Sequence, residues 1–188
     1  MPTLHIQLLS DFQLADEAAP IRTVNQPRLQ SLLACLLLHR HAPQSRQHLA
    51  FTFWPDVSEA QARNNLRQSL HQLRHALPNP DQFLQADAGS VQWLPDAPYR
   101  LDVAEFESAI ARAAAVEGTA DWRDVCQALQ QAAGLYAGDL LPSCYDDWIT
   151  PERDRLRQQC VTALNRLVYL LERLRDYGPA LDHAQRLL

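Results

Sequence analysis

Apolar and polar residues alternate at the start of the chain, and the pattern then changes to helical spacing. Residues 3–14 alternate around a Ser10-Asp11 break, which predicts short antiparallel strands with one solvated face. Pro27 suits a first helical turn, and five leucines follow it at helical spacing before His39: Leu29, Leu32, Leu33, Leu36 and Leu37. We therefore expect a small N-terminal sheet and then a helix that is buried on most sides.

Two further helices and a hairpin are predicted next. Ser45 is placed to cap a short helix that Trp54-Pro55 ends. Ser58-Glu-Ala-Gln61 has the form of a capping box and opens a helix over about 59–77, which Pro78-Asn-Pro80 stops. Residues 83–94 then predict two short strands about a glycine-containing turn, in the position of a wing. Strand signals end after Leu94.

The second half is predicted to be helical throughout. Asp102 and Glu105 are placed to cap a helix over 102–116, and Leu101 and Phe106 to form a hydrophobic staple. Further helices are expected over 121–136, over a long segment ending near Arg175, and from about Gly178. The long helix carries one apolar stripe: Leu156, Cys160, Leu164, Leu167, Leu171 and Leu174.

These patterns together predict a mainly α fold with small β elements. Sheet, three helices and hairpin, in that order, are the layout of a winged helix-turn-helix, whose third helix enters the DNA major groove. Stacked helix pairs of the tetratricopeptide kind fit the rest of the chain. We place the winged-helix domain at 1–97 and the helical domain at 98–188.

Charge is distributed unevenly over the chain, whose formal net charge is -5. All 17 basic residues are arginine, and residues 1–95 carry seven of them against seven acidic residues. The remaining residues carry ten arginines against fifteen acidic residues, and six of the seven histidines lie in the first half. A surface that binds nucleic acid is therefore expected in the first half.

Several classes of protein are disfavoured by the sequence. The four cysteines are far apart, and we expect reduced thiols in the core. The chain starts with no pattern of an export signal and contains no run of eighteen apolar residues, so we expect a cytoplasmic protein that does not span a membrane. Motifs of nucleotide hydrolysis, serine hydrolysis and zinc proteolysis are missing from the sequence. We expect neither enzyme activity nor a cofactor or metal.

The helix over 59–77 carries the residues that suggest a function. Four leucines, at positions 66, 70, 73 and 77, anchor one side of it. Arginines lie beside this stripe, and no acidic residue occurs from Arg63 to Asn79. Arginine pairs with guanine or phosphate, and Asn or Gln pairs with adenine. An ordinary amphipathic helix with a solvated basic face is the alternative, but the winged-helix context favours DNA.

We assign candidate roles to the polar residues by position. Those expected to contact the groove are Arg63, Asn64, Arg67, Gln68 and His71. Arg74 is assigned either a phosphate or a salt bridge at the edge of the core, and Arg46, with Gln44, either a phosphate or an ordinary solvated surface position. In the wing, Gln92, with Gln85 and Ser90, either reaches the minor groove or is solvated. The four tryptophans are expected to pack in the core: Trp54, Trp93, Trp122 and Trp148.

An ordered series of motifs runs along the chain. It comprises Trp54-Pro-Asp, Leu66-Arg-Gln-Ser-Leu70, Asp102-Val-Ala-Glu-Phe-Glu107, Gly138-Asp-Leu-Leu-Pro142, and Trp148 followed by Glu152-Arg153. The series resembles the Streptomyces antibiotic regulatory proteins (SARP) and their relatives. The resemblance implies an OmpR-type winged helix and a bacterial transcriptional activator domain that is tetratricopeptide-like. It further implies binding to direct repeats at promoters and recruitment of RNA polymerase, with Asp56 and Val57 in the loop that contacts polymerase.

Two details modify this resemblance. Gly89-Ser-Val-Gln-Trp-Leu94 departs from the wing strand of many members, which leaves the wing contacts open. That segment and Ala97-Pro-Tyr-Arg-Leu-Asp102 look more like large multidomain regulators in which an ATPase follows, so we expect further C-terminal domains in a longer parent protein.

The expected function is that of a sequence-specific transcriptional activator. Its helical domain is expected to serve partner contact or homodimer formation. The alternative is a protein-interaction module that uses the winged helix for docking. A basic strip that is continuous over the third helix and the hairpin would favour DNA, whereas a neutral or apolar patch would favour a protein partner.

Overall fold

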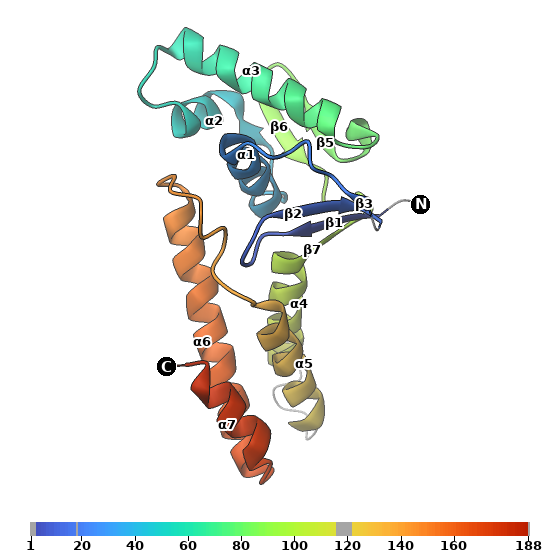
Figure 1. Ribbon diagram of the computed structural model, residues 1–188, viewed down its shortest axis with the longest axis vertical. Coiled ribbons are helices and arrows are strands. Elements are labelled where there is room, and N and C mark those ends of the chain that lie inside the picture. The colour runs from blue at the N-terminus through green and yellow to red at the C-terminus, as the bar shows by residue number, and fades with distance from the viewer. Residues whose placement is uncertain (1–2, 18, 116–121, 188) are drawn as a thin grey trace. The chain divides into compact units, whose positions relative to one another are not determined.

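The computed structural model of the chain describes residues 3–17, 19–115 and 122–187 (Figure 1). The chain forms two compact units. The first comprises Met1–Ile6, Phe12–Arg100 and Ser143–Ile149, and the second comprises Gln7–Asp11, Leu101–Pro142 and Thr150–Leu188. The predicted fold class, a winged helix followed by a helical domain, is confirmed.

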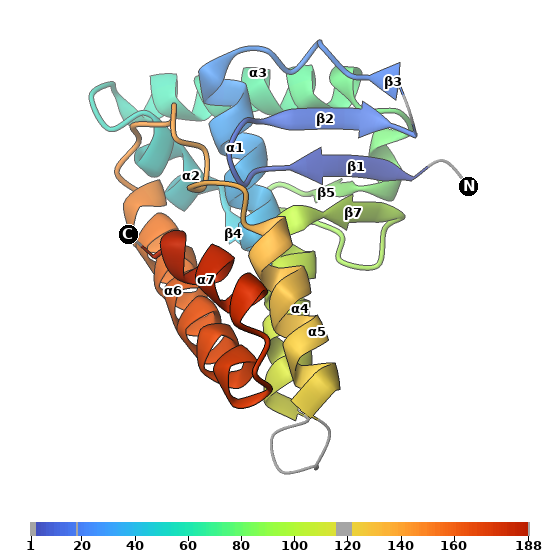
Figure 2. The ribbon, with the colours of Figure 1, turned by 60° about the horizontal axis from the view of Figure 1, so that its bottom comes forward.

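The N-terminal sheet has four strands in the order β3-β2-β1-β7 (Figure 2). They are β1 (Leu4–Gln7), β2 (Gln13–Asp16), β3 (Ala19–Pro20) and β7 (Tyr99–Leu101). Leu4 and Ile6 are buried while His5 is exposed, as the alternating pattern predicts. The prediction that no strand follows Leu94 is wrong, because β7 joins this sheet. A strand of three residues is too short to give a period of two, and it forms by pairing with a distant partner.

Three helices form the centre of the first unit: α1 (Pro27–Leu38), α2 (Arg46–Phe53) and α3 (Glu59–Ala76). The hydroxyls of Ser45 and Ser58 accept hydrogen bonds from the backbone N–H groups of His48 and Gln61, both at 3.4 Å, so both predicted N-caps are present. Every residue from Leu32 to Leu37 is buried, which confirms that α1 is covered on most sides. After α3 the chain turns through Asn79 into a short 3-10 helix, η1 (Pro80–Gln82).

The predicted hairpin is formed by β5 (Leu84–Ala86) and β6 (Ser90–Trp93), which pair antiparallel. The Phe83 and Trp93 rings stack with their centroids 5.5 Å apart, and Trp93 is fully buried. A two-residue strand, β4 (Gln44–Ser45), extends this sheet on the other side of β6. Because β4 ends where α2 begins, it holds the start of α2 next to the turn of the hairpin.

The second unit contains the helices α4 (Asp102–Ala115), α5 (Trp122–Leu135), α6 (Ile149–Arg173) and α7 (Tyr177–Gln185). α4 and α5 pack against each other. The expected helix ends at residues 116 and 121 lie outside the described residues. The α6 stripe is buried as predicted except for Leu174, which follows the helix and is 46% exposed. The prediction that Trp122 packs in the core is also wrong, because its position at the first turn of α5 leaves it 55% exposed.

Candidate nucleic-acid interface

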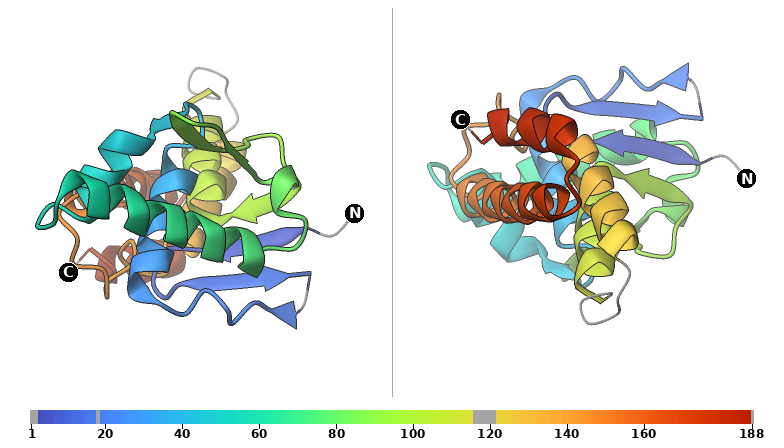
Figure 3. Two further views of the ribbon diagram at one scale, coloured as in Figure 1. Left: turned by 90° about the horizontal axis from the view of Figure 1, so that it is seen from above. Right: turned by 90° about the horizontal axis from the view of Figure 1, so that it is seen from below.

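α3 is anchored on one side and open on the other. Four apolar residues fix its inner side, and they are buried: Ala62, Leu66, Leu70 and Leu73. Figure 3 (left) shows the helix lying across α1, with the hairpin beside it. Of the predicted groove residues, Arg63, Arg67, Gln68 and His71 are exposed, and Asn64 is half-buried. The structure therefore brings all five to one side of α3.

The two arginines near the start of this side are held by neighbours one turn away. Arg63 forms an ion pair with Glu59. Arg67 donates to the side-chain oxygen of Asn64 at 2.5 Å. Surface pairs of this kind contribute about 0.3–0.5 kcal/mol, so a stronger anionic partner can replace them. Both guanidinium groups are thus ordered in the free protein and still available to a ligand.

A hollow of about 390 Å³ joins three elements of the first unit. It lies among the start of α2, the first half of α3 and the turn between β5 and β6. Three arginines contribute to its lining, together with small or polar residues and one larger apolar residue: Arg46, Arg63, Arg67, Ser45, Gln47, Ala88, Gly89 and Leu66. No carboxylate belongs to this set of described residues, so the hollow is suited to an anion.

The turn of the hairpin is built around Asp87. Its carboxylate accepts hydrogen bonds from the backbone N–H groups of Gly89 at 2.7 Å and Ser90 at 2.6 Å, and from the Ser90 hydroxyl at 2.9 Å. These bonds, with a smaller contribution from Arg46, lower the pKa of Asp87. Arg46 in turn donates to the Asp87 carbonyl at 3.0 Å, and its own N–H to the Gly89 carbonyl at 2.9 Å. The turn therefore fixes Arg46 at the rim of the hollow.

Two other predicted site residues have partners inside the first unit. Arg74 forms an ion pair with Asp81 and donates to the Leu84 carbonyl at 3.2 Å. The salt-bridge alternative for Arg74 is thus the contact present in the free protein. Gln92 is half-buried and donates to the Arg40 carbonyl at 3.1 Å.

Gln44 shares its predicted role with Arg46, and Gln85 and Ser90 share theirs with Gln92. The Gln44 amide donates to the carbonyls of His39 and Ala42, at 3.4 and 3.0 Å. Gln85 is exposed, and the Ser90 hydroxyl is engaged by Asp87.

The loop between α2 and α3 presents the two residues that the resemblance assigns to polymerase. Asp56 and Val57 are exposed, and 41% of the Val57 surface is accessible although its side chain is apolar. Phe53 is fully buried at the end of α2 and packs on Trp54 with ring centroids 6.0 Å apart. The loop therefore extends from a fixed base.

Residues Ser143–Ile149 belong to the first unit, although they follow the Gly138-Asp-Leu-Leu-Pro142 motif of the second. Asp146 forms an ion pair with Arg28 at 2.9 Å and accepts the hydroxyl of the buried Ser31 at 2.5 Å. The Trp148 indole N–H donates to the same hydroxyl oxygen at 3.0 Å. Sequence reasoning missed these contacts, because their partners are more than a hundred residues apart.

Asp102 has more hydrogen-bond partners in the second unit than the sequence predicted. Its carboxylate accepts from the backbone N–H of the adjacent Val103, and also from the backbone N–H groups of Leu8 and Leu9, at 2.8 and 2.7 Å. Burial raises the pKa of Asp102, although all three bonds oppose that shift. Asp102 therefore holds the Gln7–Asp11 turn of the second unit.

The Gly138-Asp-Leu-Leu-Pro142 motif is held by arginines of α6. Arg153 donates to the carbonyls of Leu140 and Leu141, at 2.9 and 2.7 Å. Arg157 binds the Asp139 carboxylate, which also accepts the Tyr136 hydroxyl at 2.9 Å. The bond from Arg157 is the largest cause of a lowered pKa at Asp139. The motif is therefore structural.

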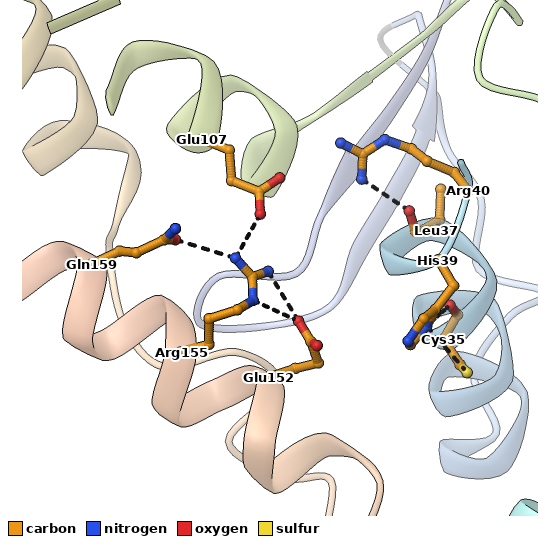
Figure 4. A network of polar contacts seen from close by, with 8 residues as sticks. All are labelled: Cys35, Leu37, His39, Arg40, Glu107, Glu152, Arg155 and Gln159. Atoms are coloured by element: carbon orange, nitrogen blue, oxygen red, sulfur yellow. Dashed lines mark hydrogen bonds and ion pairs between the residues drawn. The ribbon is translucent and has the colours of Figure 1, made fainter. Parts of the chain in front are cut away.

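A further arginine of α6, Arg155, binds three side chains. It pairs with Glu107 and Glu152, each at 2.9 Å, and donates to Gln159 at 3.3 Å (Figure 4). Burial lowers the pKa of Arg155, but the two carboxylates outweigh it and the pKa is raised. In the first unit, the same figure shows Arg40 donating to the Leu37 carbonyl and His39 next to Cys35.

The described part of the chain contains no cluster of three or more His, Cys, Asp or Glu side chains placed to hold a metal ion. None of its helices combines the length and apolar character needed to cross a bilayer. The four cysteines form no disulfide, and Cys35, Cys126 and Cys160 are buried as predicted, whereas Cys144 is half-buried because it lies in the Ser143–Ile149 loop and not in a helix.

The chain is similar to known proteins in both sequence and structure. Residues 101–188 match the bacterial transcriptional activator domain. The whole chain matches EmbR of Mycobacterium tuberculosis, solved in complex with a low-affinity phosphopeptide, with a TM-score of 0.79 and 20% sequence identity. The chain spans half of the length of that EmbR chain. Among curated proteins, no sequence matches it. The expected SARP-like resemblance, with its activator domain, is confirmed.

Proposed function

We propose that this chain binds double-stranded promoter DNA through α3 and activates transcription, a proposal supported by the match of residues 101–188 to the bacterial transcriptional activator domain. The observation that carries the proposal is the hollow lined by Arg46, Arg63 and Arg67. It joins α2, α3 and the hairpin turn, which are the parts of a winged helix that approach a duplex. The hairpin itself has no basic residue between Phe83 and Leu94, so the positive charge beside its turn comes from Arg46 of α2 and from α3.

Phosphate binding is proposed for the hollow. The guanidinium groups of Arg46, Arg63 and Arg67 provide donors and positive charge for the oxygen atoms of one phosphate. Asp87 does not oppose an anion there strongly, since its carboxylate is directed into the turn and accepts three hydrogen bonds. Such contacts fix the register of a protein on the duplex but do not read its sequence.

Base recognition is proposed for the uncharged polar residues of α3. Gln68 and His71 follow the arginines on the exposed side, and the half-buried Asn64 lies between Arg63 and Arg67, so their amide and imidazole groups can pair with base edges. The exposed side of α3 can contact only a few base pairs, so a single chain is expected to bind DNA with limited affinity. Binding as a pair to direct repeats, with the helical domain contacting the second copy or another partner, is proposed for this reason.

Contact with RNA polymerase is proposed for Asp56 and Val57. They lie in the loop that precedes α3. When α3 occupies the DNA groove, this loop remains accessible to a second protein. An exposed apolar side chain beside a carboxylate suits a small protein contact.

The test starts from DNA without an assumed operator. A random duplex library is incubated with the chain, the bound sequences are enriched, and the best one is labelled for fluorescence anisotropy at several salt concentrations. Arg67→Ala should weaken binding about tenfold, since a hydrogen bond to a charged group such as phosphate is worth about 1.5–3 kcal/mol. Arg22→Ala, which removes an equal charge from the exposed segment before α1, is the control. Equal isotherms for Arg67→Ala and the unchanged chain would refute the proposal.

A further inference from the structure

Two histidines on the exposed side of α3 direct the same ring nitrogen toward each other. His71 and His75 are four residues apart, so their side chains lie one above the other on the helix. Their ring centroids are 4.2 Å apart, and the two Nε2 atoms are separated by 3.0 Å. Both residues are exposed. In this arrangement one ring donates its N–H to the lone pair of the other.

The same arrangement fits a metal ion held by both rings. Nitrogen–metal bonds to imidazole are about 2.0–2.1 Å long. Two nitrogen atoms 3.0 Å apart then subtend about 90° at the metal. That is the angle between neighbouring ligands in tetragonal or octahedral sites, which Cu²⁺ and Ni²⁺ favour. A tetrahedral Zn²⁺ site needs the nitrogen atoms about 3.4 Å apart, so Zn²⁺ fits less closely.

The arginines nearest to these histidines along α3 each have a partner within the protein. Arg74, which precedes His75, forms its ion pair with Asp81, and Arg67, one turn before His71, is bonded to Asn64. No cluster of three ligating side chains exists among the described residues, so the protein supplies two ligands and water the others. Two histidines are too few for a recognisable metal motif, which is why sequence analysis indicated no metal.

We propose that His71 and His75 chelate one divalent Cu²⁺ or Ni²⁺ ion through their Nε2 atoms. Binding breaks the hydrogen bond between the rings, and each ring then carries its remaining proton on Nδ1. The ion links two successive turns of α3. The site is formed by the protein alone, so it does not depend on DNA binding.

The experiment uses the chain without an affinity tag and without DNA. CuCl₂ is titrated into it, and the bound Cu²⁺ is examined by electron paramagnetic resonance, which reports the number of coordinating nitrogens. NiCl₂ is titrated separately by calorimetry. We expect one ion per chain, a signal of two equivalent nitrogens, and at least tenfold weaker binding of both ions in His71→Ala and in His75→Ala.

Controls separate this site from other surface histidines. His48→Ala and His41→Ala remove exposed imidazoles from α2 and from the turn before β4, and they should bind both ions as the unchanged chain does. Circular dichroism confirms that each variant is folded, and His75→Gln repeats the test with a polar replacement. Unchanged Cu²⁺ and Ni²⁺ affinity in both alanine variants, or a copper signal with a single nitrogen, would overturn the proposal. Neither result bears on whether the chain binds DNA.

Discussion

The arginines of α3 and those of α6 illustrate two uses of one residue type. On α6, Arg153 and Arg155 bind carbonyls and carboxylates from other elements of the second unit. On α3, Arg63 and Arg67 bond to side chains of the same helix, and 61% of the Arg63 side chain is exposed. Removing an α6 arginine breaks tertiary structure, whereas removing Arg67 frees only a local partner. An arginine whose partners lie only on its own helix is therefore more available to a ligand than one that joins two elements of the fold.

Substitution of Asp102 should produce the largest effect on stability. Asp102→Ala leaves three backbone N–H groups without their acceptor, at Leu8, Leu9 and Val103. Unfolding free energy should fall by about 3 kcal/mol, since a buried unpaired donor costs about 1–3 kcal/mol. Urea denaturation measures the loss. A fall below the error of that measurement would mean that the turn does not depend on Asp102.

Asp102 also predicts a dependence of stability on pH. Its folded pKa is raised by burial, so the folded state holds the proton more tightly than the unfolded state. Stability from this group is thus fully present below the unfolded pKa and is lost as pH rises through the folded pKa. Asp102→Asn keeps an acceptor oxygen but does not titrate. Its unfolding free energy should decline less over that range than that of the unchanged chain.

Ala88→Glu tests the hollow lined by Arg46, Arg63 and Arg67. Ala88 is an exposed residue of the hairpin turn that lines the hollow, so a carboxylate there repels phosphate. Affinity for the selected DNA should fall about tenfold, because one unit charge is added near a phosphate at short range. Ala88→Gln has almost the same shape without the charge, and it should bind nearly normally. Equal weakening in both variants would point to shape instead of charge.

Asp139→Asn should have a smaller effect, confined to the second unit. The folded pKa of Asp139 is lowered, first by the hydrogen bond from Arg157. Its contribution to stability is present above the unfolded pKa and is lost as pH falls through the folded pKa. Since a third of the side chain is exposed, the loss in Asp139→Asn at neutral pH should stay near or below about 1 kcal/mol. DNA affinity should not change, and a clear change would contradict a purely structural motif.

Substitution of the loop before α3 should leave both stability and DNA affinity unaltered. Asp56→Ala and Val57→Ala each remove exposed atoms without a partner role in the hollow. Transcription from a reporter that carries the selected sequence should nevertheless decrease, since small contacts of this kind contribute about 1 kcal/mol or less to an interface. Normal reporter activity in the double variant would exclude this loop from activation.

Sequence patterns predicted the elements whose signals are local. The leucine spacing of α1 and α3, the caps Ser45 and Ser58 and the hairpin turn each depend on neighbouring residues, so they were correctly placed. Contacts over long distances were not predicted: the pairing of β7, the docking of Asp146 on Ser31, and the bonds from Asp102 to Leu8 and Leu9. Such pairings leave no periodic trace in the chain. For the candidate interface, the composition of α3 was evident, but the part of Arg46 in the hollow required the fold.

Because every basic residue is arginine, one spectrum can report all of them. The most direct test is to follow the arginine Nε–H resonances by nuclear magnetic resonance while the selected DNA is added. We predict that the signals of Arg46, Arg63 and Arg67 shift, whereas those of Arg153 and Arg155 stay in place. Shifts confined to the arginines of the second unit, with the α3 signals unchanged, would contradict the assignment of the DNA-binding surface.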